Sequence, residues 1–239
     1  PVRIQHRSGK VWVCNSLDLK ELGFKDTELI EGLERSSRGL LTGRIVRRDR
    51  LLDERLKHAN ASRTPNITAY SRQLARYGIV GITDTSASNT TDTLADFQRL
   101  SDGGELLQHF SLMGNDDLDS GYLKILLDEN RLPDLENLVV RINQARRKGR
   151  NLAFHCVTHL ELVFALAALA EAAPCEAGFD RIEHGAVVND EMAHRLADLG
   201  LPVITQPGFL FSKGDQYLAD LTRIELGSLY RFAGLQRLG

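Results

Sequence analysis

Residues 151–157, NLAFHCV, and 181–185, RIEHG, are short apolar runs that each carry a histidine, His155 or His184, near the end. Runs of this length between turn signals predict buried strands. An earlier run, 121–127, GYLKILL, carries Lys124. In a parallel α/β barrel the carboxyl ends of successive strands converge on one face, so these three side chains are expected to share a site. A site of this composition suggests metal or acid–base chemistry.

Three more strand-like runs accompany them: IVGITDT (79–85), LLQHFSL (106–112) and PVITQ (202–206). Helical patterns separate most of the six runs. The clearest helix spans 133–149, where Pro133 fits the first helical position and Gly149 ends the helix. Other predicted helices span residues 66–78, 160–173 and 189–200. The helix 160–173 is expected to lie mostly in the core or at a subunit interface. The helix 189–200 has Asn189 as a cap and Gly200 just past its end.

Alternating strands and helices indicate an α/β fold with a parallel sheet. No G-x-G-x-x-G or G-x-x-x-x-G-K-[ST] motif follows any of the predicted strands, which disfavours a nucleotide-binding doubly wound sheet. We therefore expect an incomplete (β/α)8 TIM-type barrel with about six of the eight strands. The barrel is expected over residues 65–239, and residues 1–64 are expected to form an inserted hairpin and cap segment. The predicted hairpin has strands VRIQ and KVWVC around a Ser8-Gly9 turn, and a short helix follows from Asn15 or Ser16.

Composition excludes several partners. The 30 basic and 32 acidic residues are interspersed and give a formal net charge of −2, so no charge field favours nucleic acid or an anionic membrane. The chain contains neither an apolar run long enough to span a membrane nor a signal-peptide pattern. Three cysteines, Cys14, Cys156 and Cys175, are interpreted as free thiols of a reducing, cytoplasmic compartment. A small-molecule substrate is expected, and a homo-oligomer is compatible with the sequence.

Several of these segments resemble one family. RSGKVWVCNSLDL (7–19), YGIVGITDT (77–85), GYLKILLDE (121–129) and FHCVTHLELVFALAAL (154–169), with RIEHGAVV (181–188) and VITQPGFL (203–210), are similar to the amidohydrolase superfamily, especially its N-substituted formamide deformylase branch. The resemblance implies a metal-dependent hydrolase of non-peptide C–N bonds. It implies that His155 and His184 bind metal and that Lys124, carboxylated on its amine, bridges two ions. Imidazoles suit divalent ions, so one or two zinc ions are expected.

Two features of the family pattern are absent. No two histidines lie two residues apart, so the His-x-His of the first barrel strand is missing, and so is the aspartate after the eighth strand. We therefore expect a fragment of a longer hydrolase, inactive alone. A non-catalytic or degenerate barrel module is the alternative, and a Schiff-base enzyme using Lys124 is a third hypothesis.

Four other polar positions have expected roles. Strand alternation predicts that Glu183 points away from the barrel interior, toward the helices, as an ion-pair partner. His159 is interpreted as a surface or capping residue, Asp84 as a turn or cap residue, and Gln206-Pro207 as the lining of a pocket. Lys124 could also pair with Asp128 or Glu129.

Overall fold

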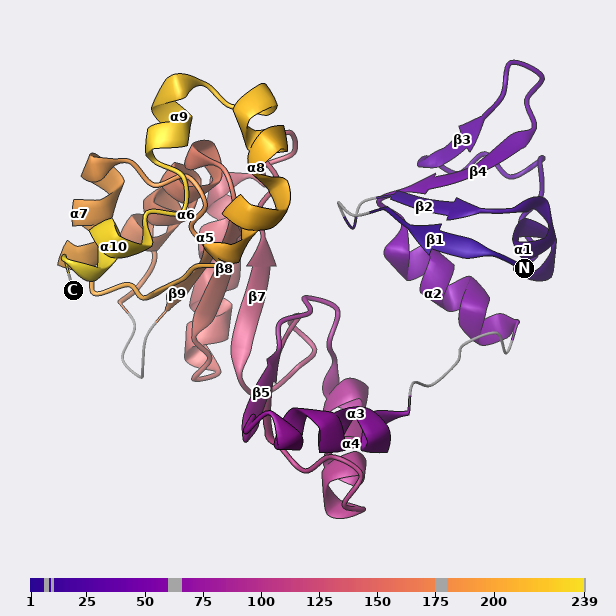
Figure 1. The fold of residues 1–239 in the computed structure, drawn as a ribbon, viewed down its shortest axis with the longest axis horizontal. Coiled ribbons are helices and arrows are strands. Elements are labelled where there is room, and N and C mark those ends of the chain that lie inside the picture. Colours follow the sequence, from indigo (N-terminus) through magenta and orange to yellow (C-terminus); the bar gives the residue numbers. More distant parts are fainter. Residues whose placement is uncertain (7–8, 10, 60–65, 175–179, 239) are drawn as a thin grey trace. The chain divides into compact units, whose positions relative to one another are not determined.

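The computed structural model describes residues 1–6, 9, 11–59, 66–174 and 180–238. The chain divides into two compact units, Pro1–Asn66 and Ile67–Gly239, and each has its own hydrophobic core (Figure 1). The predicted domain boundary between residues 64 and 65, Ser8 of the predicted turn and Cys175 lie outside the described residues.

The first unit contains an antiparallel sheet in the order β1-β2-β4-β3 with two helices. Its elements are β1 (Arg3–Gln5), β2 (Val11–Cys14), α1 (Ser16–Glu21), β3 (Leu33–Arg35), β4 (Leu41–Val46) and α2 (Asp49–His58). The predicted hairpin and short helix are confirmed as β1, β2 and α1, and Asn15 caps α1 by accepting from the backbone N–H of Asp18. The rest of the sheet and α2 were not predicted.

Gly43 explains part of this omission. It lies inside β4 with a φ of +89°, and a Cβ atom there would lie 2.1 Å from the carbonyl oxygen of Cys14 on β2. The close approach of the two strands requires glycine, but glycine in a sequence argues against a strand.

The second unit alternates helices with strands. Its elements are α3 (Ile67–Arg76), β5 (Gly81–Asp84), α4 (Thr91–Asp102), β6 (His109–Gly114), β7 (Tyr122–Leu126), α5 (Leu135–Arg147), β8 (Leu152–Cys156), α6 (His159–Glu171), β9 (Arg181–His184), α7 (Asp190–Asp198), β10 (Val203–Ile204), α8 (Gly208–Asp220), α9 (Arg223–Gly227) and α10 (Phe232–Gln236). Each of the predicted strand runs overlaps one of the strands β5–β10, although β6 extends two residues beyond the predicted run 106–112.

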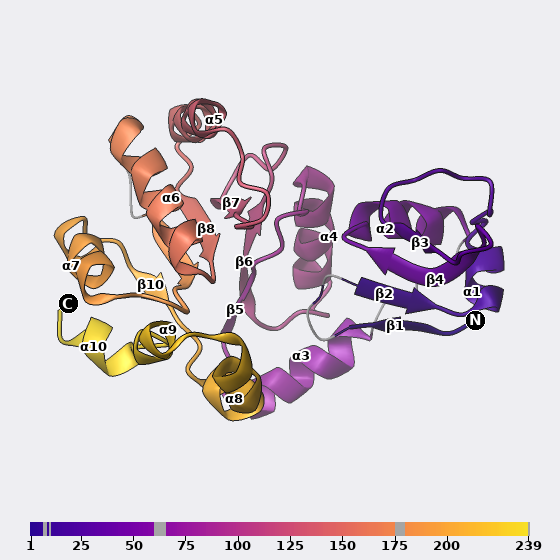
Figure 2. The ribbon, with the colours of Figure 1, turned by 90° about the horizontal axis from the view of Figure 1, so that it is seen from above.

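The strands of this unit form one sheet in the order β5-β6-β7-β8-β9-β10, and every neighbouring pair is parallel. The sheet is curled into a half-barrel, which confirms the expected incomplete TIM-type architecture (Figure 2). Within the described residues, β5 and β10 are its two edges.

The helices α5, α6 and α7 lie along one face of the curled sheet (Figure 2). The core between them and the sheet includes Leu123 and Ile125 of β7, Leu152 and Phe154 of β8, and Ile182 of β9, all at most 2% exposed. These residues alternate along their strands, so the intervening side chains occupy the opposite, inner face.

The helix ends follow the sequence closely, with one correction. Asn189 caps α7 by accepting from the N–H of Met192, and Gly78, Gly149 and Gly200 all have positive φ just past a helix. The cap of α5, however, is Asp134, which accepts from the N–H of Asn137. The prediction of Pro133 as the first helical residue was therefore wrong by two positions, because the capping carboxylate follows the proline.

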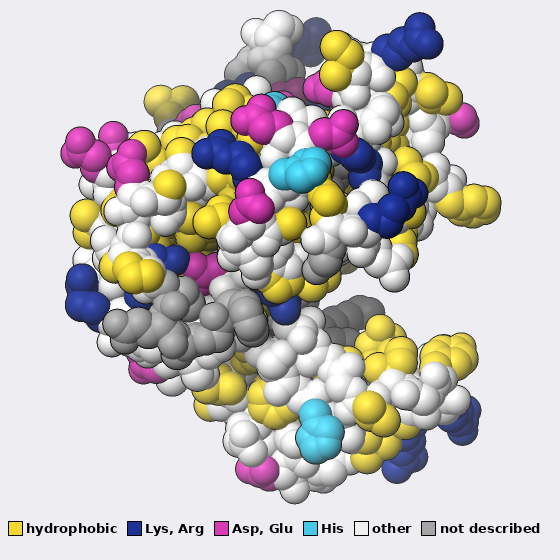
Figure 3. All heavy atoms as spheres, turned by 90° about the vertical axis from the view of Figure 1, so that its left-hand side faces the viewer, with side chains coloured by type: hydrophobic (Ala, Val, Ile, Leu, Met, Phe, Trp, Pro, Cys, Tyr) yellow, Lys and Arg dark blue, Asp and Glu magenta, His cyan; other side chains and the backbone are white. Residues whose placement is uncertain are grey.

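Among the described residues, none of the helices is long and apolar enough to cross a membrane. Acidic, basic and hydrophobic side chains are interspersed on the face drawn in Figure 3.

Candidate functional site

The inner face of the half-barrel is polar. The strand register places Lys124 of β7 beside Ala153 of β8, which in turn lies beside Arg181 of β9. His155 of β8 lies beside Glu183 of β9 in the same way. Neighbours in register share a face of the sheet, so Lys124, His155, Arg181 and Glu183 all project away from the helices.

His184 reaches this inner face through an irregular turn. Its register partner is Cys156, whose side chain packs into the helix-side core, so regular alternation would direct His184 there too. Instead, His184 has a φ of +72°, and the N–H of Gly185 donates to the carbonyl of Glu183 at 3.0 Å. This is a γ-turn of the positive-φ type, which is rare and strained for a non-glycine residue. The turn redirects the imidazole of His184 toward that of His155.

The two histidines form the centre of the candidate site. The ring centroids of His155 and His184 lie 4.6 Å apart, with an angle of 78° between the ring planes. Both side chains are half-buried at the carboxyl end of the sheet. The Nδ1 atom of His184 lies 2.7 Å from Oε1 of Gln206, just beyond β10. The predicted proximity of the two histidines is therefore present, together with a third polar side chain.

Glu183 does not point toward the helices, and that prediction was wrong. Strand alternation counted back from His184 gives the wrong direction for Glu183, because the turn at His184 breaks the alternation. Oε1 of Glu183 lies 2.6 Å from Nε of Arg181, whose guanidinium carbon stacks 4.6 Å from the centroid of the Tyr122 ring. Glu183 is thus an ion-pair partner, but on the inner face.

Lys124 is 4% exposed and lies two residues closer to the amino end of the sheet than the neighbour of His155, which is Leu126. Burial lowers the pKa of Lys124 below its ordinary value, and the carboxylate of Glu183 opposes that shift. Strand β8 lies between the strands that carry Lys124 and Glu183. Its residue beside Lys124 is Ala153, whose small side chain leaves space between the two longer side chains.

Two other polar predictions have mixed outcomes. Asp84 accepts from the N–H of Ser86 and the amide of Asn89, which confirms its turn role. Burial would raise the pKa of Asp84, but these hydrogen bonds outweigh it and the pKa is lowered. The cap of α6 is Thr158, paired with Glu161, and not His159, whose Nδ1 atom is buried without a hydrogen-bond partner.

The donor chemistry of the histidine pair fits a divalent cation. Neutral imidazole is a ligand for zinc and similar ions, and rings this close fit as two ligands of one ion. In the part of the chain that is described, no group of three or more His, Cys, Asp or Glu side chains is arranged to hold an ion. His155 and His184 thus provide part of a ligand set.

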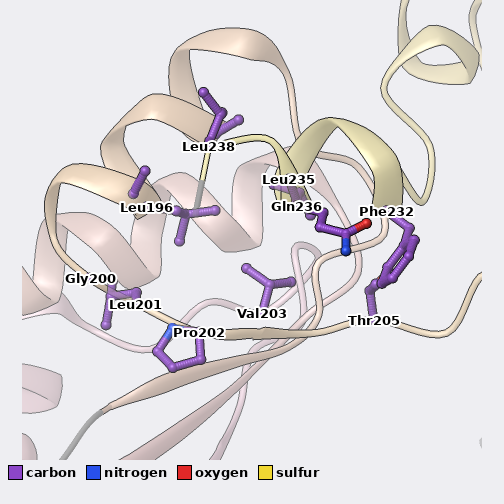
Figure 4. Close-up of a pocket in the computed structure, with 12 residues that line it drawn as sticks. Leu196, Gly200, Leu201, Pro202, Val203, Thr205, Phe232, Leu235, Gln236 and Leu238 are labelled. Atoms are coloured by element: carbon purple, nitrogen blue, oxygen red, sulfur yellow. The ribbon is translucent and has the colours of Figure 1, made fainter.

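An apolar pocket of about 550 Å³ lies outside this site, between α7, β10 and α10 (Figure 4). Its lining includes Leu196, Leu201, Val203, Phe232 and Leu235. Val203 is the register neighbour of Ile182, which packs in the helix-side core. The pocket therefore belongs to the helix side of the sheet and not to the face with the histidines.

With this geometry in place, comparisons with known proteins identify the family. The sequence profile described as "Amidohydrolase family" matches residues 1–229. The chain belongs to the amidohydrolase family. No curated protein matches it significantly.

Two solved structures share the fold of this amidohydrolase. One is an uncharacterized metal-dependent hydrolase from Pyrococcus furiosus, with a TM-score of 0.71 and 19% identity; the match covers 100% of this chain and 57% of that one. The other is an uncharacterized metal-dependent hydrolase from Pyrococcus horikoshii OT3, with a TM-score of 0.69, 19% identity and coverage of 100% and 55%. The chain thus spans a little over half the length of these structures.

The sequence predicts Gln206 only as part of the lining of a pocket and gives no connection to His184. The position of Gln206 in the sequence could have predicted the contact. Gln206 follows β10, which is the parallel neighbour of β9, and the carboxyl ends of neighbouring parallel strands lie close together.

Proposed function

We propose that the protein is a metal-dependent hydrolase of amide-type C–N bonds other than peptide bonds, similar in activity to N-substituted formamide deformylases and acting on a small molecule. The observation that carries the proposal is the pair His155 and His184, with ring centroids 4.6 Å apart at the ends of adjacent strands in a member of the amidohydrolase family. Zinc is the proposed cation.

In this proposal His155 and His184 hold the cation through imidazole nitrogens. The chemistry that a bound divalent cation supplies is acidification of water, to a pKa of about 7, and polarisation of the substrate carbonyl. Lys124 contributes an anionic oxygen only if its neutral amine is carboxylated, and burial favours the neutral amine. The Glu183 carboxylate favours the ammonium form, so it opposes carboxylation.

Metal content tests the proposal directly. The 239-residue chain, purified with zinc, should contain zinc near stoichiometry by elemental analysis, and His155→Ala and His184→Ala should each lose it. His194→Ala is the matched control, because His194 is exposed on α7 and its Nδ1 lies 2.7 Å from the backbone carbonyl oxygen of Asp190 in the same helix. Hydrolysis of a panel of N-substituted formamides is expected only with a complete ligand set, and there it should follow the zinc content. Activity retained by both histidine variants with full zinc would refute the assignment.

A non-catalytic module is the second candidate. It is favoured by the partial ligand set, since zinc usually takes four ligands and the described residues provide two imidazoles near each other. It predicts a wild-type chain that folds but contains negligible zinc and hydrolyses none of the formamides. The same elemental analysis therefore separates the two candidates.

A further inference from the structure

We propose that Gln206 is a positioning residue that fixes the tautomer of His184, with the proton on Nδ1 and the lone pair on Nε2. The role in metal binding rests on the proposed function, but the tautomer itself does not. Nδ1 of His184 lies 2.7 Å from Oε1 of Gln206. One of these two atoms must carry a hydrogen for the contact to be a hydrogen bond.

The second contact of Gln206 decides which atom that is. Its Nε2 lies 3.1 Å from the carbonyl oxygen of Ile204. A carbonyl oxygen only accepts, so the side-chain NH2 of Gln206 must face Ile204 and the side-chain oxygen must face His184. Because that oxygen also only accepts, Nδ1 of His184 is the donor. The imidazole then offers its lone pair at Nε2.

This tautomer is not the one that the ring adopts by itself. A neutral imidazole side chain in water prefers the proton on Nε2, so the contact with Gln206 reverses the intrinsic preference. A nitrogen must present a lone pair to bind a metal, and metal-binding histidines usually donate their other N–H to a neighbouring oxygen. Gln206 gives His184 this arrangement without touching the ion.

The backbone holds the two residues in this relationship. The turn at His184 continues into Gly185, where a Cβ atom would lie 2.6 Å from Cγ1 of Val203 on β10. The end of β9 therefore packs closely against the strand that leads to Gln206. Both the ring of His184 and its acceptor are placed by the same strand pair.

The tautomer can be read directly by long-range 1H–15N NMR of protein labelled in the histidine ring nitrogens. Spectra are recorded without metal at a pH of about 8, where imidazole is neutral, and the His184 signals are assigned by their absence in His184→Asn. Wild-type protein should show a protonated Nδ1. Gln206→Leu, which removes the acceptor, should shift His184 to a protonated Nε2, and Gln206→Glu, which keeps an acceptor oxygen, should restore the wild-type pattern.

Thr205→Val is the matched control, because the buried hydroxyl of Thr205 has no hydrogen-bond partner and its loss should leave the His184 spectrum unchanged. A wild-type His184 protonated on Nε2 overturns the proposal, and this result does not depend on whether the variants fold. An unchanged tautomer in folded Gln206→Leu also overturns it.

Zinc affinity, measured by competition with a chelator, tests the link to metal binding. Gln206→Leu should weaken zinc binding about 10- to 100-fold, with recovery in Gln206→Glu. A wild-type chain that binds no zinc but shows the expected tautomers would contradict the proposed function and leave the role of Gln206 toward His184 supported.

Discussion

Lys124 and Glu183 both project from the inner face of the half-barrel, and the carboxylate of Glu183 favours the charged form of Lys124 although a whole strand, β8, separates their backbones. Arg181 shares the same carboxylate through a 2.6 Å contact. The ion pair of Arg181 thus depends on a buried carboxylate, since the side chain of Glu183 is only 4% exposed. A group of this kind is costly to disrupt, because each unpaired charge would remain in a poorly solvated environment.

Glu183→Gln is therefore expected to destabilise the second unit by about 3 kcal/mol or more. The measurement is urea unfolding followed by circular dichroism. Asp96→Asn is the matched control: it removes the Asp96–Arg99 pair on α4, whose side chains are 69% and 67% exposed, and should cost less than about 1 kcal/mol. Equal losses in the two variants would show that the inner-face charges do not depend on Glu183. Adding Lys124→Met to Glu183→Gln should recover part of the loss.

Arg150 stabilises the connection between β6 and β7. Its guanidinium donates to the carbonyls of Asn115, Gly121 and Tyr122 at 2.7, 3.2 and 3.0 Å, and the residue is 3% exposed. Lysine offers one nitrogen where arginine offers three, so Arg150→Lys should leave buried carbonyls unpaired and cost about 2 kcal/mol. Arg147→Lys, at an exposed position of α5, should be nearly neutral in the same unfolding measurement. Similar stabilities for both variants would contradict the prediction.

Substituting Gly185 and Gly200 by alanine distinguishes the cost of backbone strain from the cost of a steric clash. Both have positive φ, +49° and +61°, but a Cβ atom at Gly185 would meet Val203 whereas one at Gly200 would meet nothing within 4 Å. Gly200→Ala should cost about 1 kcal/mol from backbone strain alone. Gly185→Ala should cost about 1–3 kcal/mol more, because it also overpacks the contact with Val203.

A double variant checks the cause of the difference. Val203→Ala removes the colliding methyl group, so adding it to Gly185→Ala should cost less than the two single substitutions would together. Strict additivity of the unfolding free energies would mean that the contact with Val203 is not what requires glycine at this position.

The thiols of Cys14 and Cys156 are expected to be unreactive in the folded chain. Burial, and then the neighbouring Asp18, raises the pKa of Cys14 to about 12, and burial, followed by Glu161, also raises the pKa of Cys156. Since the thiolate is the reactive form, few thiolates exist at a pH of about 8. A Cys175→Ser variant should react slowly with a disulfide reagent at that pH when folded, and release two equivalents in guanidinium. Rapid reaction of the folded variant would contradict these environments.

The second unit was predictable because its signals are local and repeated. Apolar runs such as LAFHC and RIEH are buried on the helix side, and glycines just past helices mark the ends, so strand positions and fold class follow from pattern alone. The first unit was harder. The strand Leu33–Arg35 has three residues, and the strand Leu41–Val46 has Gly43 at one of its two buried positions, where the sequence shows no apolar side chain. Neither gives a periodic signal.

The candidate site could be predicted only in part. Its location follows from strand ends, but the direction of each side chain depends on φ at a single residue, His184, and no pattern of hydrophobicity reports a backbone angle. The wrong orientation of Glu183 came from the same source. The contact of Gln206 with His184 depends on the register between two strands, which the sequence does not specify.

The separation of the two cores has a spectroscopic consequence. The chain has a single tryptophan, and Trp12 packs against the core of the first unit. Tryptophan fluorescence therefore reports on residues 1–66, whereas Glu183, Arg150 and Gly185 all lie in the other unit. An unfolding curve recorded at this one chromophore would therefore follow the first unit, and not the half-barrel that carries the variants proposed above.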